Sequence, residues 1–198
     1  MIRTQTRIVR GRVLRALLDR YVGEDLLYHE PNNFRVPRFL LNDYVRYWRT
    51  MAVDSAQKRR DRTQKWALRN IKLRLSRKLI FVAGLWACLS CDLHPSAGLQ
   101  KARKANDRTA VGQEMTSFLM SFSQQSPLET LASAFLRYKA WNAALRKRLE
   151  KLTLINAMSD ETFKRGKKDA LEFQKGLTTL FFHTDKKLTS ATEIDGVF

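Results

Sequence analysis

The residues with the clearest chemical potential are basic and amide side chains, which recur at helical spacing in two segments. In residues 37–60 they follow one another at intervals of three and four, which places them along one ridge of a helix. In residues 63–92 they flank an apolar stripe. Arginine binds phosphate bidentately and asparagine adds directional hydrogen bonds, so both segments predict phosphate binding. The candidate residues are Arg38, Asn42, Arg46, Arg49, Arg69, Asn70, Lys72, Arg74 and Arg77.

Other interpretations of these side chains stay open. The ridge can be neutralised by Asp43 and Asp54, which lie beside it. The abundance of arginine, 16 Arg against 4 Lys in residues 1–92, can also follow from GC-rich codon usage. Trp48 and Trp66 could stack on a base, but Trp48 falls among the apolar residues of its helix, which favours packing.

The sequence offers no catalytic residues. Nucleotidyl transfer needs a Gly-Ser or Gly-Gly turn and then two carboxylates one residue apart, which hold the catalytic metal. The nearest approach is Gly84 followed by Asp92, and the second carboxylate is missing. No histidine follows an arginine at the spacing of helical ribonucleases, and no Walker A loop, dinucleotide glycine motif or nucleophile elbow occurs.

Two groups of residues are candidates for metal ligands. Cys88 and Cys91 form a CxxC with only His94 nearby, whereas a structural zinc site needs four ligands. We therefore expect both cysteines to be buried and reduced. Three carboxylates near His29 could hold a metal, although solvation or pairing with arginine is favoured, and we predict no metal ligand and no cofactor in this chain. These carboxylates are Glu24, Asp25 and Glu30.

The net charge predicts an anionic partner. The chain has 37 Lys and Arg against 19 Asp and Glu, a formal charge of +18. Residues 1–92 contribute 20 basic and 8 acidic side chains, or +12, and residues 93–198 contribute 17 and 11, or +6. Such an excess attracts nucleic acid, nucleotide phosphates, an acidic protein or an anionic membrane surface.

Helical periodicity dominates the chain, and alternating strand patterns are absent from the sequence. We expect an all-α, multi-helix bundle of about five to seven helices. Pro37 suits the first turn of one helix, Ser126 opens a capping box for another, and Ser159 is expected to cap the last. The expected helices cover residues 4–22, 37–60, 63–92, 111–124, 127–158 and 160–182.

The apolar positions predict how these helices pack. The helix at 63–92 should be buried deeply beyond Leu79, where it is apolar nearly all round. We expect one helical domain over residues 1–183, with a motif-bearing half at 1–92 and a hairpin-like half at 110–183, and a flexible tail at 184–198. In the first helix the residues expected to face inward are Ile8, Val13, Leu14, Leu17, Leu18 and Tyr21.

The sequence predicts a cytoplasmic protein without a transmembrane segment. Residues 1–7 lack the apolar region of a signal peptide. The longest apolar run, Leu79–Cys91, falls short of the roughly 20 residues that span a membrane. Reduced cysteines suit the same compartment.

Two motifs carry a resemblance to a known family. Residues 39–50 read FLLNDYVRYWRT, Asp54 follows, and residues 66–78 read WALRNIKLRLSRK. Together they resemble a helical region of bacterial nucleotidyltransferases, which in that family follows an N-terminal polymerase-beta-like catalytic domain. The resemblance covers residues 1–92 well and the remainder loosely. The catalytic domain and its carboxylates have no counterpart in this chain.

The resemblance implies a helical nucleotide- or nucleic-acid-binding accessory domain of a nucleotidyltransferase. This chain would bind and orient, and a separate catalytic domain in a partner would supply Mg²⁺ and the nucleoside triphosphate. The alternative is a basic protein-interaction module that docks an acidic or catalytic partner. A third hypothesis is non-specific binding of DNA or RNA by charge alone.

Overall fold

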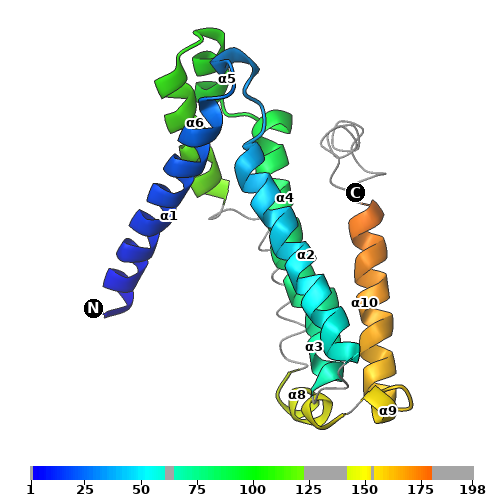
Figure 1. Cartoon of the computed structure of the whole chain (residues 1–198). Helices are drawn as coiled ribbons and strands as arrows, with labels where there is room; N and C mark the ends of the chain where they lie inside the picture. Colours follow the sequence, from blue (N-terminus) through cyan, green and yellow to red (C-terminus); the bar gives the residue numbers. More distant parts are fainter. Residues whose placement is uncertain (1, 61–64, 123–141, 153, 180–198) are drawn as a thin grey trace. The chain divides into compact units, whose positions relative to one another are not determined.

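The computed structural model describes residues 2–60, 65–122, 142–152 and 154–179, and its regular elements there are all helical (Figure 1). No strand occurs among these residues, and the all-α, multi-helix class predicted from the sequence is confirmed. In chain order the elements are α1 (Ile2–Leu26), the 3-10 turn η1 (Pro31–Asn33), α2 (Arg38–Arg60), α3 (Trp66–Lys72), the π-helical η2 (Leu73–Arg77), α4 (Lys78–Leu93), α5 (Ala97–Lys104), α6 (Arg108–Phe122), α8 (Asn142–Lys151), α9 (Leu154–Ala157) and α10 (Glu161–Thr179).

The described residues fall into two compact units. Unit 1 takes its residues from 1–44 and 84–126, and unit 2 takes them from 45–83 and 127–198. Each unit thus combines residues from both of the expected halves. The capping box at Ser126 and the expected tail lie outside the described residues.

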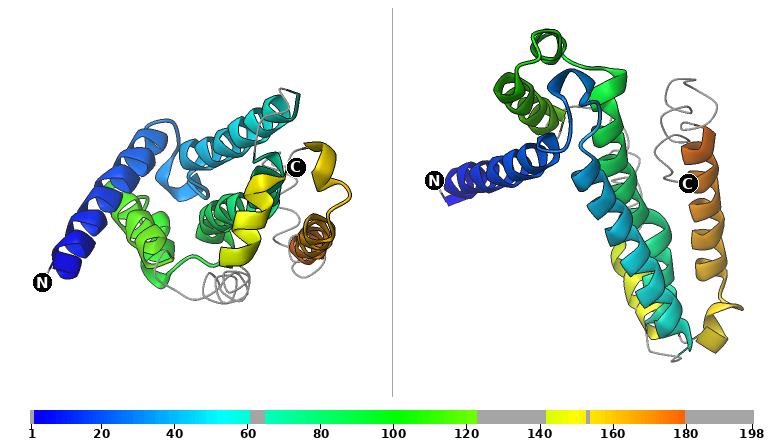
Figure 2. Two further views of the ribbon diagram at one scale, coloured as in Figure 1. Left: turned by 90° about the horizontal axis from the view of Figure 1, so that it is seen from below. Right: turned by 45° about the horizontal axis from the view of Figure 1, so that its top comes forward.

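The core of unit 1 joins α1 to α6, which lie side by side (Figures 1 and 2). Each helix presents a buried stripe at intervals of four residues, the spacing that repeats one face of a helix. A third layer comes from α5 and from Cys91 of α4. The two stripes are Leu18, Val22 and Leu26 on α1, and Val111, Met115 and Leu119 on α6.

The expected inward face of α1 is partly wrong. Leu18 is buried, but Val13 is 55% and Leu17 51% exposed, and Leu14 is also exposed. The buried stripe lies instead in the second half of α1 and continues to Leu26, which explains why the helix runs four residues past its expected end. The choice of face depends on where α6 lies, and periodicity within α1 does not contain that information.

A buried arginine ties the connecting segments of unit 1 together. Arg103 of α5 donates from Nε to the carbonyl oxygen of Phe34 at 2.9 Å, and from Nη2 to those of Arg35 and Cys91 at 3.1 Å each. Burial lowers the pKa of Arg103 from its ordinary value. One guanidinium therefore donates to three backbone carbonyls and links α5 to the segment before α2 and to α4.

The carboxylates around His29 separate into different roles. The buried side chain of Asp25 accepts the backbone N–H of Phe39 at 3.2 Å, and so caps α2 from the end of α1. Burial raises the pKa of this carboxyl group. Glu24 instead pairs with Arg20 at 2.8 Å. Among the described residues, no three His, Cys, Asp or Glu side chains gather as metal ligands would.

The apolar α4 confirms the expected burial of the cysteines. Cys88 and Cys91 are free and fully buried, and burial raises the pKa of Cys91 to about 12. Such thiols stay protonated and unreactive. Leu85 and Leu89 are also fully buried, although Ile80 is 53% exposed.

No single helix in the described ranges has the length and apolar composition to cross a membrane. The run Trp66–Leu93 passes that test only when it is joined to α5, from which it is bent by 56°.

In unit 2 the apolar stripe of α3 and η2 packs against α8, α9 and α10. Trp66 meets Phe163 of α10 with ring centroids 5.4 Å apart. The sequence predicts an apolar stripe of Leu68, Ile71, Leu75, Leu79 and Val82, and all of these are buried except Leu79, which is half-buried. The buried cluster comprises Trp66, Ala67, Leu68, Ile71, Leu75, Leu149, Ala157, Phe163 and Ala170.

Two expectations for the C-terminal helices are wrong. The single helix expected to end near Met158 appears as α8, which ends at Lys151, followed by the separate α9. The cap of α10 is Asp160 and not Ser159: its Oδ1 accepts the N–H of Phe163 at 3.0 Å. Its Oδ2 accepts Nε and Nη2 of Arg148 at 3.0 and 2.9 Å, a pairing open to the carboxylate and not to a hydroxyl group.

Gly84→Ala tests the packing of unit 1. A Cβ at Gly84 would overlap the ring of Tyr44, so we expect a loss of about 1–3 kcal/mol in the free energy of unfolding. At Gly11 of α1 nothing lies within 4 Å, and Gly11→Ala should stabilise by about 0.5–1 kcal/mol. Urea unfolding compares the two variants. Equal stability of Gly84→Ala and the wild type would contradict this packing.

The pair of Asp160 and Arg148 should make unit 2 sensitive to acid. Burial opposes ionisation, but the N–H of Phe163 and the Arg148 side chain outweigh it and lower the pKa of Asp160. The stabilisation is therefore complete above the ordinary aspartate pKa of about 4, and it is lost as the pH falls through the lower pKa of the folded state.

Asp160→Asn keeps the cap and loses the charge, whereas Asp160→Ala loses both and should cost about 0.5–2 kcal/mol for the cap alone. Urea unfolding at pH 7 and pH 3 measures the difference, and the wild type should lose more stability than Asp160→Asn between the two values. The exposed pair of Glu172 and Lys175 supplies the control, Glu172→Gln, for which we expect no change. An identical acid response of the wild type and Asp160→Asn would show that the ion pair contributes nothing.

Candidate functional site

The positive charge of the chain is concentrated in one segment of unit 2. Residues 45–83 contain 12 Lys and Arg against two Asp, a net charge of +10 out of the total of +18. We call this segment the basic hairpin, because its first arm is the later part of α2 and its second arm runs through α3 and η2 into α4. The last turn of α2 alone contains Lys58, Arg59 and Arg60, where the negative end of the helix dipole favours cations.

Aromatic contacts hold the two arms of the basic hairpin together. Trp48 of the first arm stacks on Phe81 of the second, with ring centroids 5.5 Å apart and planes 23° from parallel. The ammonium group of Lys78 lies 5.5 Å above the Trp48 ring and also bonds to Gln174 of α10. Burial lowers the pKa of Lys78. Trp48 is thus a packing residue, as its position among apolar neighbours indicates.

Seven of the nine predicted phosphate-binding residues lie on the basic hairpin. Arg46 and Arg49 are exposed on the first arm; Lys72 and Arg74 are exposed on the second. The half-buried members of the second arm are Arg69, Asn70 and Arg77. The other two, Arg38 and Asn42, are exposed at the start of α2 and belong to unit 1.

One carboxylate partly neutralises the basic hairpin. Asp54 forms an ion pair with Lys58 one turn along α2. The pKa of Asp54 is lowered by Lys58 first, and then by the charges of Arg77 and Arg69. The sequence left open a pairing of Asp54 with the arginines of the ridge, whereas Asp54 forms its ion pair with Lys58, which lies outside the ridge. One negative charge beside three positive ones still leaves this part of the surface cationic.

An internal hydrogen bond orients one of the exposed arginines. Arg74 donates from Nε to Oδ1 of Asn70, one helical turn earlier, at 3.1 Å. The bond uses one edge of the guanidinium and leaves its other donors at the surface, since arginine has five N–H donors. Asn70 therefore has a positioning role that its spacing alone does not reveal.

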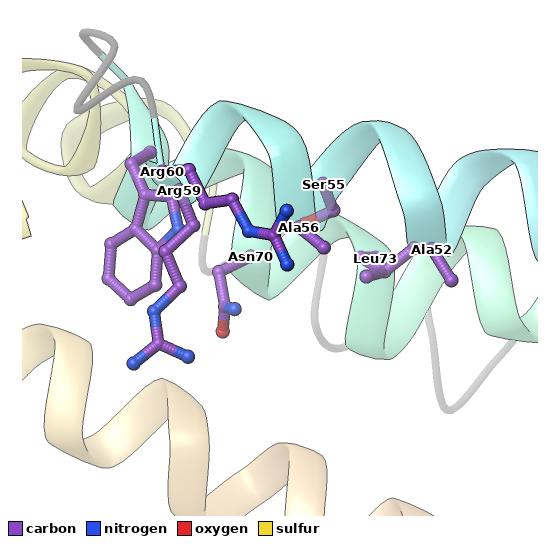
Figure 3. A pocket seen from close by; sticks show the side chains of 8 residues that line it. Ala52, Ser55, Ala56, Arg59, Arg60, Asn70 and Leu73 are labelled. Atoms are coloured by element: carbon purple, nitrogen blue, oxygen red, sulfur yellow. The ribbon is translucent and has the colours of Figure 1, made fainter.

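An open pocket of about 520 Å³ lies between the two arms, near the end of α2 (Figure 3). Its size is in the range of small-molecule sites. Arg59 and Arg60 contribute guanidinium groups, and in this view the amide of Asn70 lies between them. The remaining lining combines small and apolar side chains with one hydroxyl group. These residues are Ala52, Ser55, Ala56, Trp66 and Leu73.

Trp66 lines this pocket as well as packing into the core. The side chain is only 4% exposed, and its indole N–H is buried without a hydrogen-bond partner in the described part of the chain. A buried donor in that state costs about 1–3 kcal/mol. Because this N–H is buried, the polar groups that the pocket offers are the two guanidinium groups, the amide of Asn70 and the hydroxyl group of Ser55.

Sequence reasoning missed Arg59 and Arg60. The signal was the run Lys58-Arg59-Arg60, which reads equally well as a polar turn after a helix. Its location opposite Asn70 depends on how the second arm packs, and no spacing within one helix encodes that.

Comparison with family models, with curated proteins and with solved structures finds no match to this chain. The resemblance to nucleotidyltransferases accordingly rests on the two sequence motifs alone. The basic hairpin and its pocket are the structural features that bear on the function of this chain.

Proposed function

We propose that this chain binds the phosphate groups of nucleic acid or nucleotides through the basic hairpin. The observation that carries the proposal is the concentration of +10 of the +18 charge within residues 45–83, on two helix arms whose described residues include one carboxylate, Asp54. A polyanion gains long-range attraction and releases counterions when it meets such a surface.

The kind of basic residue favours phosphate over other anions. Eight of the 12 cations in the basic hairpin are arginines, which pair with phosphate through two parallel hydrogen bonds. Arg49, Lys72 and Arg74 are exposed, so we assign them to contacts with the phosphate backbone. Such contacts position a nucleic acid without reading its sequence. Arg46, Arg69 and Arg77 extend the same set.

We extend the proposal to the whole chain, which we take to be a helical accessory module in nucleotidyl transfer. Residues 45–50 and 66–78 of the two resembling motifs belong to the basic hairpin, so the resemblance and the charge coincide. Catalysis, with Mg²⁺ and a nucleoside triphosphate, is assigned to a separate catalytic partner. The buried thiols of Cys88 and Cys91 accord with a cytoplasmic location.

A second candidate function, docking of an acidic or catalytic protein, is favoured by the surface of α1. Val9, Val13 and Leu17 are each more than half exposed and follow one another at intervals of four residues. Arg10 and Arg12 are exposed beside them. An apolar line with cations at its edge suits an acidic amphipathic helix.

Two triple variants that remove the same charge test the phosphate-binding function. Arg49→Ala with Lys72→Ala and Arg74→Ala alters the basic hairpin, and Arg10→Ala with Arg12→Ala and Arg15→Ala alters α1. Fluorescence anisotropy with a labelled duplex, from 50 to 300 mM salt, measures affinity and its salt dependence.

We expect the hairpin variant to bind at least about tenfold more weakly, with the salt slope reduced by about two to three. The α1 variant should bind almost as the wild type does. Equal losses in both variants would show binding by net charge alone, and no binding of the wild type at low salt would overturn the proposal. Capture of a protein partner that depends on Val13 and Leu17 would support the second candidate.

Removing the carboxylate of the basic hairpin should have the opposite effect. Asp54→Asn takes away the negative charge beside Lys58, Arg69 and Arg77, so we expect affinity for the duplex to rise several-fold and the salt slope to steepen. Asp19→Asn, at an exposed position of α1, changes the net charge equally and serves as the control. If both variants gain equally, the basic hairpin has no special part in binding.

A further inference from the structure

The pocket between the arms of the basic hairpin has features that exposed phosphate contacts do not require. A surface that follows a nucleic-acid backbone needs only exposed cations, whereas this open pocket of about 520 Å³ combines two cations and an amide with aliphatic walls. Residues from both arms build it, and all of them belong to unit 2. We therefore treat the pocket as a candidate ligand site that is separate from the exposed cations.

We propose that this pocket binds a terminal phosphate, the phosphomonoester at the end of a nucleic-acid strand or on a mononucleotide. The inference rests on the proposed function, because it takes the ligand of the basic hairpin to be phosphate-bearing. Arg59 and Arg60 are the cations for the phosphate, and the amide of Asn70 is the neutral donor.

The donor set matches a phosphomonoester better than an internal phosphodiester. A phosphomonoester has three terminal oxygen atoms and a charge of about −1.5 to −2 at pH 7, whereas an internal phosphate in a strand has two and a charge of −1. Two guanidinium groups offer a positive charge that matches the phosphomonoester. A terminal phosphate thus pairs with both cations of the pocket more completely than an internal phosphate does.

The apolar part of the lining suits the sugar and base that carry this phosphate. Ala52, Ala56 and Leu73 present aliphatic surface within the same cavity. Sites for small ligands combine such walls with a few polar groups that fix orientation. The volume of about 520 Å³ is sufficient for one nucleotide unit.

Matched oligonucleotides separate this inference from the proposed function. The probes are single strands of ten thymidines with a 3′ fluorophore and either a 5′-phosphate or a 5′-hydroxyl, together with the 3′-phosphate counterparts. Binding of the hydroxyl-ended strand tests the basic hairpin alone. The ratio of affinities between phosphate-ended and hydroxyl-ended strands tests the pocket.

We expect the wild type to bind either the 5′-phosphate or the 3′-phosphate strand about tenfold more tightly than its hydroxyl-ended counterpart. This preference should shrink below pH 6, where the phosphomonoester loses its second charge. Arg59→Lys with Arg60→Lys keeps the charge but removes the planar forks, so it should abolish the preference while the hydroxyl-ended strand still binds. Arg10→Lys with Arg12→Lys on α1 is the matched control and should keep the preference.

Competition with adenosine monophosphate distinguishes the two sources of the phosphate. If it removes the preference and spares the binding of hydroxyl-ended strands, the pocket accepts a free mononucleotide. If it has no effect while the preference is present, the pocket takes strand ends. Equal affinity of the wild type for phosphate-ended and hydroxyl-ended strands would overturn the inference and leave the basic hairpin intact, whereas failure of every strand to bind would overturn the proposed function itself.

Discussion

The stacking of Trp48 on Phe81 joins two helix arms that carry the same sign of charge, and the functional surface of unit 2 depends on it. Like charges on adjoining helices repel, although water and salt weaken the repulsion. Apolar contacts must therefore offset that cost. Trp66 adds to them by packing against Phe163, which anchors the second arm to α10. The aromatic residues thus make a dense cationic surface compatible with a folded unit, and this is a physical reason for the place of Trp48 and Trp66 in the resembling motifs.

In unit 1, charged side chains form hydrogen bonds with backbone groups near the core. Arg103 donates to three backbone carbonyls, and Asp25 accepts a backbone N–H at the start of α2. Each is a charged residue used to complete hydrogen bonding where the chain leaves a helix. These two charged side chains are therefore committed to structure. Unit 1 also has exposed cations, Arg10 and Arg12 of α1 among them, but the basic hairpin of unit 2 has the higher density of positive charge.

Within the basic hairpin, contacts between side chains modulate the charge. Asp54 moderates a group of three cations, and Asn70 orients Arg74. The pocket beside them brings two further arginines together with the amide of Asn70. A surface of this kind combines long-range attraction from its net charge with short-range selectivity from a few oriented donors. The two effects act over different distances, so they can be separated by salt and by substitution.

The sequence by itself determined the helical class, most of the helix boundaries in the first half, the buried cysteines and the stripe from Leu68 to Leu75, because these follow from periodicity within one helix. Only the tertiary structure decided which face of α1 is buried, that Asp160 caps α10, and that Arg59, Arg60, Trp66 and Asn70 line one pocket. Spacing along a helix specifies which residues share a face. It does not specify which helix meets that face, since this depends on how side chains from distant parts of the chain pack together.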